Sequence, residues 1–161
     1  MRPLEFILRT NQSIGPTILR WALALVMFPH AAQKMFGWFG GGGFSGTMHV
    51  FTSGMHIPAP LAFLAIMTEF LGVLGLALGV MTRLAALGIG FVILVAAVLV
   101  HAQHGFFMNW TGKQAGEGFE YHILMIAMAV VLVIYGGGRG ALDTVVLRRF
   151  AGIPPAPKDE F

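Results

Sequence analysis

Long apolar stretches separated by short polar segments dominate the pattern of this chain. Four of them approach the roughly 20 mostly apolar residues that a membrane-spanning helix needs. They cover residues 14–36, 58–81, 84–104 and 119–136. The third is the clearest, because residues 84–100 include no charged side chain. The pattern predicts an all-α protein, an integral membrane bundle of four transmembrane helices.

The first stretch is the most polar of the four. Arg20, His30 and Lys34 interrupt it, and Pro29 predicts a kink. A second interpretation is a signal peptide, in which Arg20 closes a basic region and residues 21–28 form a short apolar core. No convincing small-residue cleavage site precedes a soluble domain, so we favour a membrane span.

The composition agrees with lipid as the solvent of this chain. Of its 161 residues, 57% are hydrophobic and 11% are charged, against roughly 25% charged in a soluble domain. A net charge of +3, with Arg148 and Arg149 as the one dense basic pair, is too little for a nucleic-acid surface. The chain has no cysteine, which excludes disulfides, thiolate metal sites and dithiol redox chemistry within it.

The basic residues predict the orientation of the helices. Lys and Arg are retained on the cytoplasmic side of membrane spans, and four spans place both termini on one side. That side holds seven basic residues and the other side two, leaving Arg20 inside the first span uncounted. The seven are Arg2, Arg9, Arg83, Arg139, Arg148, Arg149 and Lys158, and the two are Lys34 and Lys113. Both termini are therefore expected in the cytoplasm.

The segments between and after the spans have distinct expected roles. Residues 37–57, with four consecutive glycines and flanking aromatics, predict an interfacial or re-entrant cap on the outer side. The link at residues 82–83 is so short that the second and third helices must be antiparallel neighbours, and their small residues, Gly72 to Gly90, predict close packing. Residues 1–152 are expected to form a single domain that includes an amphipathic helix over 141–150, and residues 153–161 a mobile tail.

Ionisable residues inside the apolar stretches are the candidates for a functional site. Each costs at least about 2.5–3.5 kcal/mol at the bilayer centre, so each requires a partner or a task. Apart from the first in the list, they lie in the middle or outer half of the membrane. The candidates are Arg20, His30, Lys34, Glu69, His101, His104, Glu120 and His122.

Helical spacing tests which of these side chains can converge. His30 and Lys34 are four residues apart and share a face, whereas Glu120 and His122 lie roughly 200° apart and cannot both face the bundle. We favour Glu120 as the inward one, because a carboxylate facing lipid is expensive whereas a boundary histidine reaches water. The expected result is an outward-open polar cavity lined by His30, Lys34, Glu69, His101 and Glu120. The alternative is a structural network in which Arg20 or Lys34 neutralises Glu69 and His101 bonds to Glu120.

The chain resembles the DoxX family of small four-helix membrane proteins from Arg20 to Asp143. Each motif is weak alone, but their order on four spans is fairly specific. The motifs are Arg20, His30-x-x-x-Lys34-x-Phe36-Gly37, Pro58, Glu69-Phe70-Leu71-Gly72, Leu78-Gly79-x-x-Thr82-Arg83-x-Ala85-Ala86, His101, Gly105-Phe106-Phe107, Glu120, and Gly136-x-Gly138 before Asp143. The resemblance implies a multi-pass protein of the bacterial inner membrane, with some relatives linked to sulfur-compound oxidation that feeds electrons to quinone and others to redox-stress complexes.

Three functions are compatible with this set of residues. The first is a quinone or quinol site in a membrane redox complex, in which the chain is a quinone-linked oxidoreductase subunit. In this hypothesis the catalytic residues are Glu69, His30 and His101. The ligand-binding residues are Arg20, Lys34, His104, Glu120 and His122. The second is a haem or copper site, with His30 and His101 as axial ligands or methionines as soft ligands. The third is a non-catalytic subunit or a small-solute binding protein. No covalent cofactor and no fixed metal site are expected, and the expected partners are the lipid bilayer, membrane or periplasmic redox subunits, and further copies of this chain.

Overall fold

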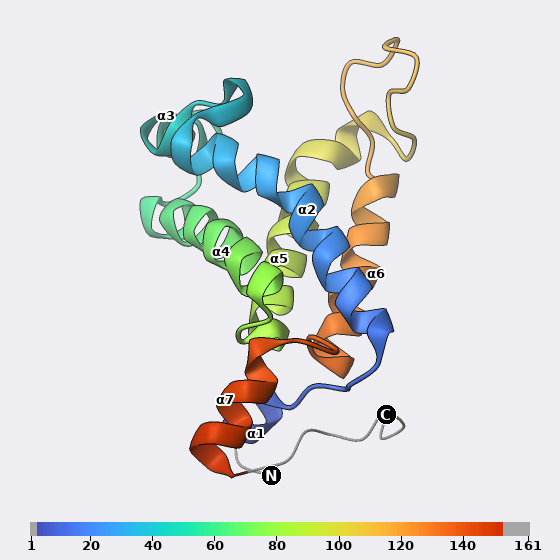
Figure 1. Ribbon diagram of the computed structural model, residues 1–161. Helices are drawn as coiled ribbons and strands as arrows, with labels where there is room; N and C mark the ends of the chain where they lie inside the picture. The colour runs from blue at the N-terminus through green and yellow to red at the C-terminus, as the bar shows by residue number, and fades with distance from the viewer. Residues whose placement is uncertain (1–2, 153–161) are drawn as a thin grey trace.

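The computed structural model describes residues 3–152, and every regular element in that range is helical. The described residues form seven α-helices, whose arrangement is shown in Figure 1. They are α1 (Pro3–Leu8), α2 (Ile14–Phe36), α3 (Gly43–His49), α4 (Ala59–Leu78), α5 (Thr82–Ala96), α6 (Glu120–Tyr135) and α7 (Leu142–Ala151). Short π-helical turns at Val50–Gly54 and Ala97–His101 extend α3 and α5.

Three helical segments are long and apolar enough to cross a membrane. They are Ile14–Phe36, Ala59–Leu78 and Thr82–His104, where the last combines α5 with the turns that follow it. The α6 helix is also apolar but has 16 residues, about 24 Å of helix against a hydrocarbon core of about 30 Å. The chain is therefore an all-helical membrane protein with three clear candidate spans and a shorter fourth apolar helix.

The four long helices form a ring. The α2 helix packs mainly on α4, and α5 mainly on α6, while α4–α5 and α2–α6 contacts join the two pairs. Each helix contributes a fully buried side chain to the common core, which contains Leu23, Leu76, Ile89 and Leu132. The predicted pairing of the second and third spans is confirmed, because α4 and α5 are in contact and joined by three residues.

Small residues bring α4 and α5 together as expected. A Cβ atom added to Gly72 would lie 2.8 Å from the Ile89 side chain, and one added to Gly88 would lie 2.7 Å from that of Thr68. Gly90 instead faces Ala129 of α6. Close approach of backbones gives the packing that replaces the hydrophobic effect between helices in lipid.

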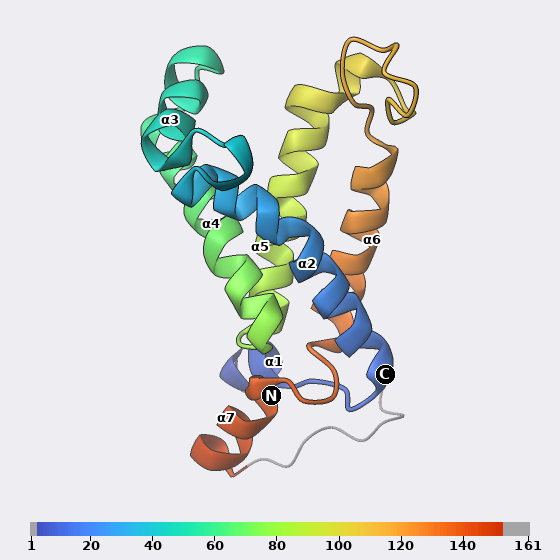
Figure 2. The same ribbon diagram turned by 45° about the horizontal axis from the view of Figure 1, so that its top comes forward.

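The two ends of the ring differ. At one end, called here the α1/α7 end, the α4–α5 turn meets the short helices α1 and α7 (Figure 1). At the other, called the α3 end, α3 lies over the ends of α2 and α4, and the 105–119 loop lies over α5 and α6 (Figure 2). Phe44 of α3 packs edge-on against Phe63 of α4 with 6.1 Å between ring centroids, which agrees with the expected cap over residues 37–57.

The α1/α7 end adds elements beyond the four apolar stretches. The predicted amphipathic segment 141–150 is the helix α7 at 142–151, with buried Asp143 and Leu147 on one face and exposed Val145 and Arg149 on the other. The short helix α1 was not predicted. Residues 153–161, predicted to be a mobile tail, lie outside the described residues.

Candidate functional site

A buried ion pair joins α2 to α4. Nζ of Lys34 lies 2.7 Å from Oε1 of Glu69 and donates a hydrogen bond to it. Glu69 is 2% exposed, whereas the Lys34 side chain is 28% exposed. The carboxylate is therefore almost completely removed from solvent and depends on this one lysine for its neutralisation.

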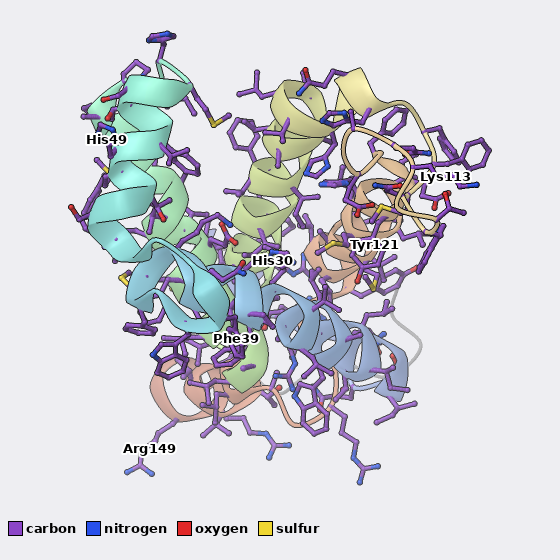
Figure 3. The ribbon with its side chains drawn as sticks, turned by 90° about the horizontal axis from the view of Figure 1, so that it is seen from above. His30, Phe39, His49, Lys113, Tyr121 and Arg149 are labelled. Carbon is purple, nitrogen blue, oxygen red and sulfur yellow. The ribbon has the colours of Figure 1, made fainter. Side chains whose placement is uncertain are left out.

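His30 lies one helical turn before Lys34 on the same face of α2, as its spacing predicts. It is exposed, and it lies within electrostatic range of Lys34, Glu69 and His101. Seen from the α3 end, His30 is in the middle of the ring of helices (Figure 3). The imidazole is therefore available to a ligand that enters beside the ion pair.

Two histidines from α5 and α6 complete the group. The rings of His101 and His122 are in contact, with centroids 4.1 Å apart and planes inclined by 44°. Nδ1 of His101 lies 2.9 Å from the backbone oxygen of Glu117 in the 105–119 loop. His122 is also within electrostatic range of His30. We call His30, Lys34, Glu69, His101 and His122 the polar cluster.

The structure reverses the expected roles of Glu120 and His122. Glu120 is the first residue of α6, and its Oε1 accepts hydrogen bonds from the backbone N–H of Met108 and from Nε1 of Trp110, both in the loop. The spacing argument is confirmed, since the two side chains do point in different directions. The choice between them was wrong, because a carboxylate at the start of a helix can satisfy itself with loop N–H groups instead of facing lipid.

Arg20 and His104 lie apart from the polar cluster, contrary to their expected grouping as ligand-binding residues. Arg20 lies at the α1/α7 end, where Nη1 donates to the oxygens of Leu76 and Ala77, both at 2.7 Å, and Nε to that of Gly137. His104 packs against Gly116 within the loop. Of the two partners considered for Glu69, Lys34 is therefore the correct one, and His101 bonds to Glu117 rather than to Glu120.

Asp143 is a buried acidic residue that the family resemblance includes but that was not among the site candidates, because it follows the last apolar stretch. It is 1% exposed. Its two oxygens accept hydrogen bonds from the N–H of Met81 and from the N–H and hydroxyl of Thr82, at 2.6 to 2.9 Å. Burial raises the pKa of Asp143 above its ordinary value, against the opposing effects of the Thr82 and Met81 hydrogen bonds and the charge of Arg20.

These contacts close the α1/α7 end into one hydrogen-bonded unit, the Arg20–Asp143 network. The N–H of Asp143 also bonds to the oxygen of Gly79, which ends α4 with φ of 69°. The start of α2 is tied to the segment after α6, because Thr17 donates to the oxygen of Arg139 and Gly138 to the hydroxyl of Thr10. Arg20 therefore satisfies carbonyls at the end of α4, a structural role.

In residues 3–152, no group of three or more His, Asp or Glu side chains is arranged to hold a metal ion. The polar cluster offers hydrogen-bonding and proton-transfer groups of a different kind. It combines an ammonium, a carboxylate and three imidazoles, which can donate, accept and transfer protons within an otherwise apolar helical region.

The identity of the chain follows from a comparison with protein families. The DoxX family model matches residues 15–102, more than half of the chain. The chain belongs to the DoxX family. Comparison with curated proteins and with solved structures gave no match.

The matched region contains most of the polar cluster of this DoxX protein. Helices α2, α4 and α5 lie within residues 15–102 almost completely, so His30, Lys34, Glu69 and His101 belong to it. The 105–119 loop, α6 with His122, and α7 with Asp143 follow the match. The ion pair therefore lies within the family region, and the histidine contact joins that region to the rest of the chain.

Proposed function

We propose that this DoxX-family protein binds a quinone or quinol at the polar cluster, as a subunit of a membrane redox complex that oxidises sulfur compounds or thiols. The observation that carries the proposal is the placement of the Lys34–Glu69 ion pair beside three histidines in apolar helices. Charges in such a position are costly and are typically functional.

The chemistry of the cluster suits a quinoid head group. Quinone oxygens need hydrogen-bond donors and quinol hydroxyls need acceptors, and histidines supply either role. Glu69 and the histidines can pass protons to a quinone as it is reduced to the quinol by electrons from the sulfur compound. A head group between the helices would leave its isoprenoid tail in the lipid.

A buried nitrogen without a partner supports a ligand at this position. Nδ1 of His122 is buried and has no hydrogen-bond partner within residues 3–152. Such atoms are uncommon in native structures, and one reason for them is a ligand that completes the bonding. His122 contacts His101 directly, so the unfilled nitrogen lies within the cluster.

The membrane arrangement that accompanies this proposal has four spans, with α6 as the fourth and the α1/α7 end in the cytoplasm. The distribution of Lys and Arg supports it. The polar cluster would then lie in the outer half of a bacterial inner membrane. Because the chain has no cysteine, dithiol chemistry would belong to a partner protein on the membrane or outside it.

Titration of a quinone analogue into purified protein in nanodiscs tests the proposal. The wild type is expected to bind the analogue. Glu69→Gln should bind it at least about tenfold more weakly, because the substitution removes the charged acceptor that holds Lys34. His104→Gln, outside the cluster, is the control and should bind as the wild type does. The proposal is wrong if the wild type does not bind or if Glu69→Gln binds equally well.

A further inference from the structure

The loop after α5 determines which nitrogen of His101 carries the proton. Nδ1 of His101 lies 2.9 Å from the backbone oxygen of Glu117. A carbonyl oxygen can only accept a hydrogen bond, so Nδ1 must be the donor. In a neutral imidazole the other nitrogen, Nε2, then has a lone pair and accepts.

This acceptor has no partner in the part of the chain that the structure describes. The side chain of His101 is partly exposed, and within residues 3–152 it forms one hydrogen bond, through Nδ1. The ammonium of the cluster, Lys34, donates to Glu69 at 2.7 Å. The neighbouring ring, His122, has its own unfilled nitrogen, Nδ1. A ligand that covers Nε2 of His101 therefore displaces water from this acceptor and must supply a donor in its place.

We infer that the ligand presents a hydroxyl group to Nε2 of His101, so that the site binds the reduced, quinol form in preference to the quinone. This inference rests on the proposed function. A hydroxyl donates one hydrogen bond and accepts others, so it can donate to His101 and accept from an N–H of the cluster. A quinone carbonyl would place its lone pairs against that of Nε2 and leave the acceptor unsatisfied.

The cost of that mismatch determines the expected selectivity. When a bound ligand excludes water from Nε2 and offers it no donor, binding is typically weakened by about tenfold or more. A ligand in which the hydroxyl is methylated should be rejected in the same way, since the ether oxygen also only accepts. The site is thus expected to distinguish O–H from C=O and from O–CH₃ on rings of nearly equal size.

A binding experiment with three probes separates the outcomes. A short-chain benzoquinol, its dimethyl ether and the corresponding benzoquinone are titrated into the wild-type protein in nanodiscs without oxygen, at about pH 8, where free histidine is neutral. The quinol is expected to bind at least about tenfold more tightly than the other two. Equal binding of quinone and quinol would overturn the inference but leave the proposed function intact, whereas no binding of any probe would overturn both.

Two further measurements show that His101 is responsible. In His101→Gln, the amide can turn either its N–H or its oxygen to the ligand, so the preference for the quinol should largely disappear. His49→Gln, at an exposed position of α3 outside the cluster, should keep the full preference. Nitrogen NMR of the histidine-labelled wild type should find Nδ1 of His101 protonated and Nε2 unprotonated, and the opposite tautomer would refute the inference without any variant.

Discussion

Glu69 carries the most deeply buried charge of the polar cluster, with 2% of its side chain exposed. Replacing Lys34 with Met would leave this carboxylate without its counter-ion. The expected loss is about 2 kcal/mol of unfolding free energy, below the roughly 3–5 kcal/mol typical of fully buried pairs, because 28% of Lys34 is exposed. Unfolding in detergent by heat or denaturant measures the loss.

The double variant Lys34→Met with Glu69→Leu provides the control for that measurement. Removing both charges leaves no unpaired group, and apolar replacements of buried pairs are often neutral. The double variant should therefore recover most of the lost stability. If the loss in the double variant equals the sum of the losses in Lys34→Met and Glu69→Leu alone, the two charges do not depend on one another, and the account of the pair is wrong.

Asp143 makes stability depend on pH through its raised pKa. The folded state holds the proton more tightly than the unfolded state, so the stability that Asp143 contributes is fully present below its ordinary value of 3.8. It is lost as the pH rises through the raised value. Asp143→Asn cannot ionise, so the stability difference between wild type and variant should move in favour of the variant across this window.

The sequence predicted most of the cluster because ionisable residues are conspicuous in apolar helices. The common face of His30 and Lys34 follows from spacing, and Glu69 was expected because it is an acid within an apolar helix. The direction of His122 did not follow, because the choice against Glu120 depended on loop donors that no helical pattern contains. Asp143 was missed for a similar reason, since its partners are backbone groups of the α4–α5 turn.

At the level of elements, the end of α4 depends on Gly79. This residue has φ of +69°, and a Cβ atom there would lie 2.6 Å from Cα of Ala141. Gly79→Ala should therefore combine backbone strain with a clash against a backbone that cannot easily move, and reduce unfolding free energy by about 2 kcal/mol or more. Thermal unfolding in detergent is the measurement.

Two other glycines separate the causes of that loss. Gly140 has a similar φ of +77° but open space around it, and Gly15 has open space and an ordinary helical backbone. Alanine should cost less at Gly140 than at Gly79, and should cost nothing or stabilise at Gly15. Equal losses at Gly79 and Gly140 would mean that contact with Ala141 does not matter.

The boundaries of the helices were predictable to different degrees. The first span begins and ends as predicted, at residues 14 and 36, because Gly37 provides a left-handed cap. The second ends at Leu78 and not at residue 81, because Gly79 adopts the left-handed conformation inside an apolar run. The helix α1 has six residues, too few for a periodic pattern, and it is held by contacts with α5 and α7.

For the whole molecule, we expect α6 to cross the membrane, and the lack of cysteine allows single introduced thiols to test this by labelling. Lys113→Cys and Arg148→Cys place single thiols at exposed positions on the two sides of α6 in sequence. In intact cells, a membrane-impermeant maleimide should label Lys113→Cys. It should label Arg148→Cys only after the membrane is opened. Labelling of both from the same side would exclude α6 as a span.

The Arg20–Asp143 network binds the start of α2, the α4–α5 turn, the end of α6 and α7 at one end of the ring. The network fixes one end of each of these helices, so the angles at which α2, α4, α5 and α6 leave it determine how far apart they lie at the α3 end. The polar cluster spans that distance, because His30, Lys34 and Glu69 lie on α2 and α4, and His101 and His122 lie on the extension of α5 and on α6.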